Sequence, residues 1–369
     1  MNARPRASYT PIQRVSRTPR SILVVATRRI GDVLLVTPLI RSLRNAYPQA
    51  TIDVLVFAGK AGVLEGNPDC SGVIEVAERP RAREHWGLLR RIFRRYDLAI
   101  ATQQSDRSHL YAWLASPRRV GLVPDMKWSS AWKRASCEAY ALLDDVNTHT
   151  VVQNLRLADQ LGIARHYDVV PPGAPRRDGL EGPYAVVHPV AMFDYKSWTQ
   201  AGWTGLISWL RAAGLKVVLS GGPSVEERAY CAALAGEPDV LDRSGKLSLA
   251  ELAQLIRGAR LYVGPDTSVT HIAAACGTPT LAIFGPSNPV KWGPWPVGAM
   301  DDPSPWRMLA RPWQRKGNVI LLQGVQPPDL GQCLPCRFEG CERHSRSVSR
   351  CLVEMPLDPV RAAATLLAG

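Results

Sequence analysis

The chain has 369 residues and lacks any apolar run of the roughly 18 residues that a membrane-spanning helix needs. Its N-terminus, Met-Asn-Ala-Arg-Pro-Arg, is positively charged, but no apolar segment follows, so it does not have the pattern of a secretion signal. Without either element, the protein is expected to be soluble and cytoplasmic. Any contact with a membrane would then be peripheral.

Four common motifs of nucleotide and hydrolase sites are also missing. The sequence has no G-x-G-x-x-G, no G-x-x-x-x-G-K-[ST] and no G-x-S-x-G, which argues against a dinucleotide dehydrogenase, a P-loop enzyme and a nucleophile-elbow hydrolase. It has no D-x-D pair, the usual carboxylate arrangement that holds a metal–diphosphate in one class of sugar transferases. A diphosphate leaving group would therefore have to be stabilised by helix N-termini and basic side chains.

Acidic residues are scarce relative to basic ones, with 32 Asp and Glu against 45 Lys and Arg, which gives a net charge of +13. Such a balance predicts an anionic partner: nucleic acid, an acidic membrane surface or a phosphorylated substrate. The charge clusters in residues 1–20, which we interpret as a disordered basic arm, and in an arginine run between Arg79 and Arg95. A solvated helix face is the alternative explanation of that run.

Two successive series of alternating strand and helix patterns fill most of the chain. The first covers residues 21–170 and the second covers residues 184–332, with a Pro- and Gly-rich linker at 171–183 between them. Residues 333–369 form a Cys-rich tail and a closing helix. We therefore predict an α/β protein with two Rossmann-like, doubly wound domains that face a central cleft. Ligands of such folds bind at the carboxyl ends of the strands.

In the first domain, the buried strand predicted at residues 22–26 is followed by the loop 27–32, which ends in Gly31-Asp32. Gly31 would let the backbone approach a ligand closely. Asp32 is a candidate to accept a proton from an attacking hydroxyl. Alternatively, Asp32 caps a helix that starts at Val33, and it could fill both roles.

In the second domain, residues 261–295 predict strand, loop, helix, turn and strand. Pro265 ends the first strand, Asp266, Thr267 and Ser268 are good N-cap residues for a helix over about 268–276, and Gly285 follows the second strand. A helix N-terminus just past a strand end is a ready site for a phosphate. His271 lies one turn into this helix. The alternative is an ordinary capped strand–helix–strand unit.

A third candidate stretch, Asp-Tyr-Lys-Ser-Trp at 194–198, follows the first strand of the second domain. Lys196 could neutralise charge that develops on a departing phosphate. A plain surface lysine is the alternative.

Three of these stretches together resemble the signatures of the ADP-heptose:lipopolysaccharide heptosyltransferases, glycosyltransferase family 9. Residues 30–44 look like the N-terminal signature of that family, residues 266–279 and 284–289 look like its C-terminal signature, and 194–198 is similar to its short D-x-K-x-W stretch. The resemblance covers about residues 21 to 365.

The resemblance implies a GT-B fold and an inverting, metal-independent transfer that requires no cofactor for catalysis. Asp32 then matches the general base, Lys196 the residue at the donor phosphates, and Asp266 the one that binds sugar hydroxyls. The remaining expected donor-binding residues are Gly31, Trp198, Gly221, Gly222, Thr267, Ser268, His271 and Gly285. The chain departs from the family at Ser268, where Gly is usual, and at Thr199, where Pro often stands. In this family an acidic residue for the nucleoside ribose lies after Gly221-Gly222-Pro223, and Glu226 and Glu227 are candidates for it.

The expected partners are ADP-heptose or a similar nucleotide sugar, a lipopolysaccharide-core acceptor and an anionic membrane surface at the inner face of the inner membrane. No nucleic acid is expected. The main rival is a transferase of the same family with another nucleotide sugar or a surface-polysaccharide acceptor. A non-enzymatic nucleic-acid- or membrane-binding protein would explain the charge but not the motifs at the strand ends.

Four cysteines crowd into the tail, at Cys333, Cys336, Cys341 and Cys351. They could bind a structural Zn²⁺, remain free or buried thiols, or form a disulfide, although a reducing cytoplasm disfavours the last. The helix predicted at about 357–367 is expected to pack back onto the first domain, as in other GT-B proteins.

Overall fold

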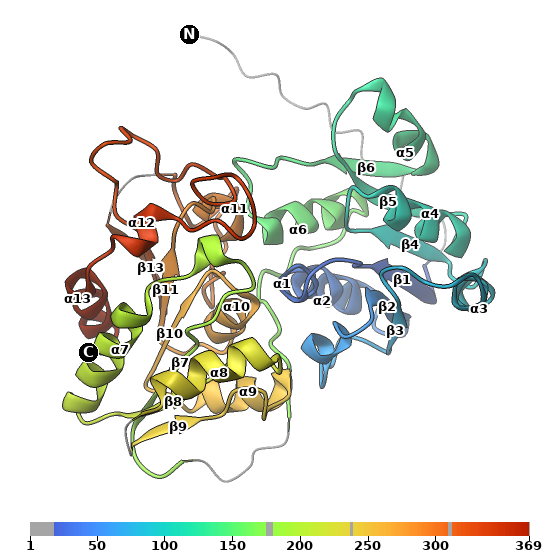
Figure 1. The fold of residues 1–369 in the computed structure, drawn as a ribbon. Helices are drawn as coiled ribbons and strands as arrows, with labels where there is room; N and C mark the ends of the chain where they lie inside the picture. The colour runs from blue at the N-terminus through green and yellow to red at the C-terminus, as the bar shows by residue number, and fades with distance from the viewer. Residues whose placement is uncertain (1–17, 175–179, 237–238, 309–311, 369) are drawn as a thin grey trace.

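The computed structural model describes residues 18–174, 180–236, 239–308 and 312–368. In this structure two β-sheets lie side by side, each flanked by helices, so the predicted α/β class is confirmed (Figure 1). Most of the predicted basic arm, residues 1–17, and residues 175–179 of the predicted linker lie outside the described part of the chain. Within that part, none of the helices combines the length and apolarity needed to cross a bilayer.

The first sheet has six parallel strands in the order β3-β2-β1-β4-β5-β6. Its strands are β1 (Ser21–Val25), β2 (Thr51–Phe57), β3 (Gly72–Val76), β4 (Leu98–Ala101), β5 (Arg119–Val123) and β6 (Ala139–Leu142). The helices around it are α1 (Ile30–Leu34), α2 (Thr37–Ala46), α3 (Ala82–Ile92), α4 (Asp106–Ala115), α5 (Ala131–Ser136) and α6 (Thr150–Gln160), with short 3₁₀ turns η1 (Ala61–Leu64) and η2 (Trp128–Ser130). The central strand β1 reads as a continuous apolar run because helices cover both faces of the sheet.

The second sheet has seven strands in the order β12-β13-β11-β10-β7-β8-β9, and only β12 pairs antiparallel. Its strands are β7 (Tyr184–Val187), β8 (Lys216–Leu219), β9 (Val240–Asp242), β10 (Leu261–Pro265), β11 (Thr280–Phe284), β12 (Trp313–Lys316) and β13 (Val319–Gln323). The helices of this half are η3 (Asp194–Lys196), α7 (Gln200–Ala212), α8 (Val225–Leu234), α9 (Leu249–Arg257), α10 (Ser268–Ala275), α11 (Pro289–Trp292), α12 (Arg350–Val353) and α13 (Leu357–Ala368). The sequence analysis did not predict β12 and β13, although Val319 to Leu322 is an apolar run.

In both sheets the strand order reverses direction next to the first strand, between β1 and β4 and between β7 and β10. Ligands of open α/β sheets bind in the crevice at the carboxyl ends of the strands where this reversal occurs. Helix α1 follows β1 and helix α10 follows β10, and these two helices contact each other. The two crevices therefore face one another across the domain boundary.

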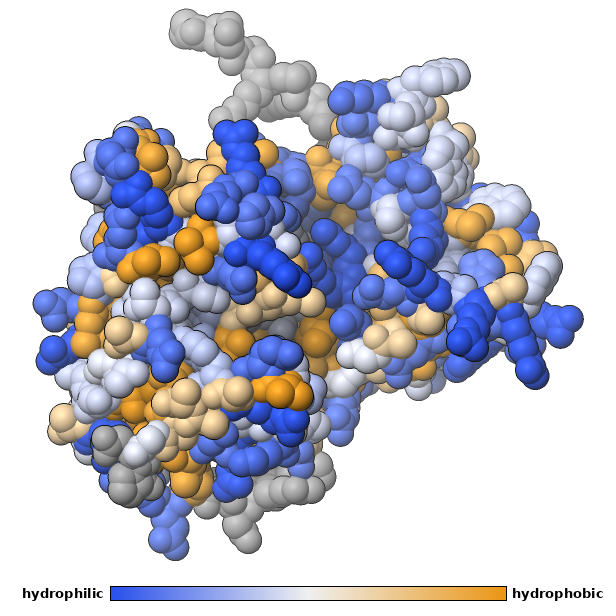
Figure 2. Space-filling model, viewed as in Figure 1, coloured by the Kyte–Doolittle hydropathy of each residue, from blue (hydrophilic) through white to orange (hydrophobic). Residues whose placement is uncertain are grey.

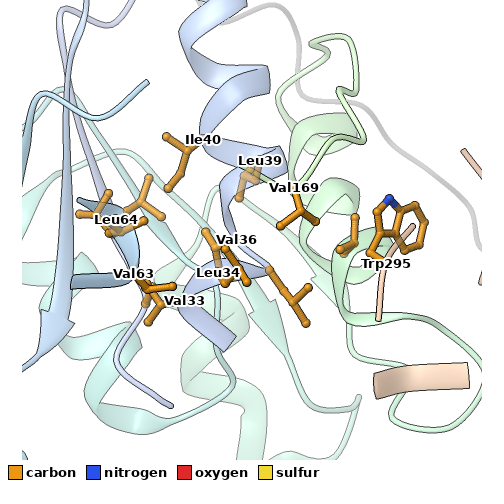
Figure 3. Close-up of a cluster of buried hydrophobic side chains, with 14 of the residues drawn as sticks. Val33, Leu34, Val36, Leu39, Ile40, Val63, Leu64, Val169 and Trp295 are labelled. Atoms are coloured by element: carbon orange, nitrogen blue, oxygen red, sulfur yellow. The ribbon is translucent and has the colours of Figure 1, made fainter. Parts of the chain in front are cut away.

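A single hydrophobic cluster runs through both domains. It joins β1 and α2 of the first domain to Ile272 and Trp295 of the second, all of them buried. Figure 3 shows the Trp295 ring beside Val169, next to the side chains that α1 and α2 contribute. Trp295 is 2% exposed and stacks on Tyr167, with ring centroids 6.3 Å apart. Separating the domains would expose this apolar surface to water, so the cluster favours the arrangement seen here.

Hydrogen bonds at the rim of the cleft reinforce this contact. His149 accepts a hydrogen bond from the Val151 amide at Nδ1, so its Nε2 carries the proton and donates to the Gly293 carbonyl at 2.7 Å. The Asn288 amide donates to the Val146 carbonyl at 2.8 Å. Burial lowers the pKa of His149 to about 3, so this histidine stays neutral and keeps its donor–acceptor pattern at physiological pH.

Two predictions about helices were wrong. The helix predicted to start at Val33 is divided into α1 and α2, because Pro38 lies in the first turn of α2 and cannot continue a helical ladder from α1. The closing helix α13 packs on the second domain, with Val360, Ala363 and Ala364 in the cluster that contains β7, β10 and α7, and not on the first domain. The apolar side chains of α13 pack against the second domain, which precedes this helix in the sequence.

Candidate functional site

Asp32 lies at the bottom of the cleft, in the first turn of α1. The N-cap of α1 is Arg29, so Asp32 is not the cap residue that the alternative reading of the sequence would make it. Its carboxylate is 3.4 Å from the guanidinium of Arg28, and its side chain is 11% exposed. Burial raises the pKa of Asp32 above its ordinary value, and Arg28 opposes that rise. A buried carboxylate whose proton affinity is increased in this way is suited to accept a proton.

A buried ion pair lies on the opposite wall. Lys196 in η3 places its Nζ 2.5 Å from Oδ2 of Asp266, which follows β10. Burial alone would raise the pKa of Asp266, but the charge of Lys196 and hydrogen bonding hold it below the ordinary value. The pair therefore stays ionised, and Lys196 is not the plain surface lysine of the alternative reading.

His271 lies next to this pair, one turn into α10. It is 6% exposed, and burial lowers its pKa to about 4, so it is neutral near pH 7. Its Nδ1 has no hydrogen-bond partner among the described residues. A buried, unpartnered ring nitrogen costs stability, and such groups are concentrated where a ligand or water completes the site.

The N-terminus of α10 is free of a side-chain cap. The N-cap residues of α7, α8 and α9, which are Thr199, Ser224 and Ser248, each accept a hydrogen bond from a backbone amide of their own helix. The N-cap of α10 is Thr267, and its side chain accepts none; its hydroxyl lies 3.3 Å from that of Thr270 instead. The N-cap residue of α10 therefore satisfies none of its first amides, and amides at a helix N-terminus can donate to an anion.

The two walls touch around this point. A Cβ added at Gly31 would lie 3.7 Å from Ser268 and 3.8 Å from the His271 ring, so Gly31 lies against the start of α10. The guanidinium of Arg29 stacks over the Phe193 ring at 4.5 Å, immediately before η3. These contacts bring the loop that holds Asp32 close to η3, which holds Lys196, and to the α10 N-terminus, which follows Asp266.

Asp32 also lines a pocket at the boundary between the two domains, and Figure 2 shows the surface hollowed between the two halves of the molecule. Its lining also includes Arg28, Thr102, Gln103, Gln104, Asp144, Asp145 and Asn154 of the first domain, and Lys291 and Trp292 of the second. Lys291 forms an ion pair with Asp145 across the boundary. The sequence reading missed these residues as a site. One signal was present, since Gln103-Gln104 lies just after the end of β4.

Other predicted site residues lie farther from the cleft surface. Trp198 is 3% exposed, packs edge-on to Trp203 and donates its indole N–H to the Met355 carbonyl at 3.0 Å, which favours a packing role beneath Lys196 over direct contact with a donor. A Cβ at Gly221 would lie 3.0 Å from the Cys231 sulfur, so that glycine is needed for close packing. The Gly222 amide is already bonded to Glu227.

Gly285 follows β11 and lies against the tail, because a Cβ there would be 2.6 Å from Leu352. The four cysteines of that tail are free: Cys351 is buried, Cys341 is exposed, and Cys333 and Cys336 are half-buried. Within the described part of the chain no three His, Cys, Asp or Glu side chains are placed so that they could hold a metal ion. In this arrangement the four tail cysteines form neither the predicted Zn²⁺ site nor a disulfide.

The sequence comparison decides the family. Residues 85–301 match the family described as glycosyltransferase family 9 (heptosyltransferase). The chain belongs to glycosyltransferase family 9. It is therefore a glycosyltransferase, as the motifs at the strand ends predicted.

Relatives of this family agree with that assignment. The chain is 29% identical over 286 residues to lipopolysaccharide heptosyltransferase 3 of Escherichia coli, covering 72% of this chain and 83% of that protein. Its structure is similar to that of E. coli ADP-heptose LPS heptosyltransferase II, with a TM-score of 0.69, 20% identity and coverage of 94% and 98%. It is also similar to E. coli heptosyltransferase WaaC with ADP-2-deoxy-2-fluoro heptose, with a TM-score of 0.63, 21% identity and coverage of 86% and 97%. The family 9 fold seen here is GT-B, as predicted.

Proposed function

We propose that this protein transfers heptose from ADP-heptose to a sugar of the lipopolysaccharide inner core, with inversion at the anomeric carbon and without a catalytic metal. The observation that carries the proposal is the uncapped N-terminus of α10 beside the Lys196–Asp266 pair, since it offers free amides and a cation where a diphosphate would lie. A relative of similar fold has been solved with an ADP-heptose analogue, which supports an ADP-linked donor.

In the proposed reaction, the Asp32 carboxylate takes the proton of the acceptor hydroxyl as that oxygen attacks the anomeric carbon. The bond from this carbon to the diphosphate oxygen breaks on the opposite side, and the electron pair leaves with ADP. The amides of α10 and the ammonium of Lys196 stabilise the charge that develops on the departing phosphate. Asp266, held ionised by Lys196, is placed to accept hydrogen bonds from sugar hydroxyls. A single displacement of this kind inverts the anomeric centre.

We assign the pocket beside Asp32 to the acceptor. It lies on the first-domain side of the base, and Gln103, Gln104 and Asp144 offer amide and carboxylate groups for sugar hydroxyls. Arg28 and Lys291 add cations at the same opening, which suits an acceptor that carries phosphate or carboxylate groups. An acceptor anchored in a lipid would place the enzyme at the inner face of the inner membrane.

The rival within family 9 uses another nucleotide sugar or a surface-polysaccharide acceptor. Isothermal titration of the protein with ADP-heptose, ADP-glucose and UDP-glucose, all in EDTA, separates the two. Selective binding of ADP-heptose is the expected result. Binding of UDP-glucose alone would replace the donor in our proposal, and a strict need for Mg²⁺ would contradict the metal-free mechanism.

The charge of Arg28 sets the pH dependence of the proposed base. Because burial raises the pKa of Asp32 and Arg28 lowers it, replacing Arg28 with glutamine should raise that pKa further. A base acts only when deprotonated, so the acidic limb of kcat/KM should move to higher pH. Arg315→Gln, in the second domain, should leave the profile unchanged. A shift to lower pH in Arg28→Gln would contradict the assignment.

A further inference from the structure

The outer face of α3, α4 and α5 exposes large apolar side chains among cations. Its exposed members are Trp86 and Phe93 at α3, Leu110 and Trp113 on α4, and Met126 and Trp128 ahead of α5. Trp128 is 91% exposed, the highest value among the exposed large apolar side chains of the described residues. The three helices follow one another along the edge of the first domain that faces away from the second (Figure 1). Figure 2 shows pale, weakly polar side chains among blue ones on this edge.

Hydrogen bonds hold the turn that carries Trp128 in place. Ser130 donates to Asp125 at 2.9 Å, and Arg134 donates to the carbonyls of Asp125 and Lys127, each at 2.9 Å. The exposed position of Trp128 is therefore built into a well-bonded turn. A partner that covers the Trp128 indole would remove its apolar surface from water, which is favourable.

The charge on this face is positive. Exposed Arg83, Arg90 and Arg91 share the outer side of α3 with Trp86, and Lys127 precedes Trp128. Two acids of the region are engaged: Glu84 caps α3, and Asp106 pairs with Lys133 at 2.9 Å. Tryptophan with arginine and lysine is the combination that proteins place at the interface of an anionic bilayer.

This face is linked to the proposed acceptor pocket. Lys133 of α5 donates to the Gln104 carbonyl at 2.7 Å, and Gln104 lines the pocket beside Asp32. A second hollow, lined by Gln103, Gln104 and Arg107, continues from that pocket toward the start of α4. The Lys133–Gln104 hydrogen bond therefore connects α5 to the pocket beside Asp32.

We propose that the outer face of α3, α4 and α5 is a membrane-docking surface in which Trp128 enters the headgroup region of an anionic bilayer and the α3 arginines contact its phosphates. The proposal rests on the proposed function only for its biological setting, because docking itself needs neither donor nor acceptor. The partner to which we commit is the lipid surface.

Co-sedimentation with vesicles tests the proposal. The intact protein should bind vesicles of phosphatidylethanolamine and phosphatidylglycerol and should bind phosphatidylcholine vesicles much more weakly. Trp128→Ala should weaken binding about tenfold, through lost apolar burial. Arg83→Gln and Arg90→Gln should each weaken it about fivefold, through one lost charge near the surface. Trp313→Ala, an exposed tryptophan in the second domain, is the matched control and should bind like the unmodified protein.

Three results would overturn the proposal: binding unaffected by Trp128→Ala, equal binding to neutral and anionic vesicles, or a self-associating protein that Trp128→Ala turns monomeric without any vesicle binding. The last would make this face a protein interface. Since Trp128 is almost fully exposed, its replacement should leave the circular dichroism spectrum unchanged. Donor titration on the same variant keeps the proposed function separate, because Trp128→Ala should bind the donor normally.

Discussion

Replacing Asp32 with asparagine is expected to reduce transfer by about 10²–10⁴-fold, the usual contribution of a positioned general base. The amide matches the carboxylate in shape, so α1 and its contact with α10 should persist. Donor binding, measured by titration calorimetry, should therefore stay near the unmodified value while turnover falls. Asparagine cannot take the proton of the acceptor hydroxyl, and this loss should remain at every pH.

The same variant should be no less stable than the unmodified protein at neutral pH. Burial raises the pKa of Asp32, so the folded state holds the proton more tightly than the unfolded state does. The stability that this proton contributes is present at low pH and is lost as pH rises through the folded pKa. Asparagine does not titrate, so the variant does not lose this stability as pH rises. Asp301→Asn, at an exposed pair with Lys316, is the control, and an Asp32→Asn enzyme within a few-fold of full activity would refute the assigned role.

Replacing Lys196 with methionine is expected to affect both folding and turnover. It leaves Asp266 buried without its partner, and breaking a buried ion pair from one side costs about 3–5 kcal/mol. It also removes a cation from the proposed phosphate site, which should lower kcat by about 10²–10³-fold. Thermal unfolding and transfer assays measure the two effects separately.

The pH dependence of this loss follows from Asp266. Lys196 and hydrogen bonding hold the pKa of Asp266 below its ordinary value of 3.8, so the pair stabilises the folded state above that value and the contribution is lost as pH falls through the folded pKa. The stability gap between Lys196→Met and the unmodified protein should therefore narrow in acid.

A double variant separates structure from chemistry. Lys196→Met with Asp266→Asn removes both charges, so much of the stability should return while turnover stays low. Lys316→Met breaks an exposed pair and should cost at most about 1 kcal/mol. Full activity in the double variant would show that the charges of this pair do not act on the donor phosphates.

The positions of the strands and of the residues at their ends could be predicted from local sequence. Val24 and its neighbours form an unbroken apolar run, and Tyr262 and Val263 end another, because parallel strands are covered on both faces. Asp32 follows the first run after a short loop, and Asp266 follows the second after Gly264 and Pro265. Local pattern was therefore enough to place both acids at the carboxyl edges of two sheets.

Local pattern did not show what surrounds these acids. Asp32 looked like a possible helix cap because Asp is a favoured cap residue, and only the helix start at Ile30 places it inside the first turn. Trp198 looked like a ligand contact, yet its indole is bonded to Met355, 157 residues away in the sequence. The break between α1 and α2 and the packing of α13 on the second domain also depend on contacts between distant segments.

By itself, the sequence determined the α/β class, the strand-end motifs and the resemblance to family 9, because these depend on residues close together in the chain. Only the tertiary structure decided that Lys196 pairs with Asp266, that the amides of α10 are left uncapped beside Asp32, and that Trp128 is held out on a bonded turn. The pKa of Asp32 depends on burial and on charges from both domains, and the pairing of Lys196 with Asp266 depends on how the second domain folds. Neither can be read from spacing along the chain.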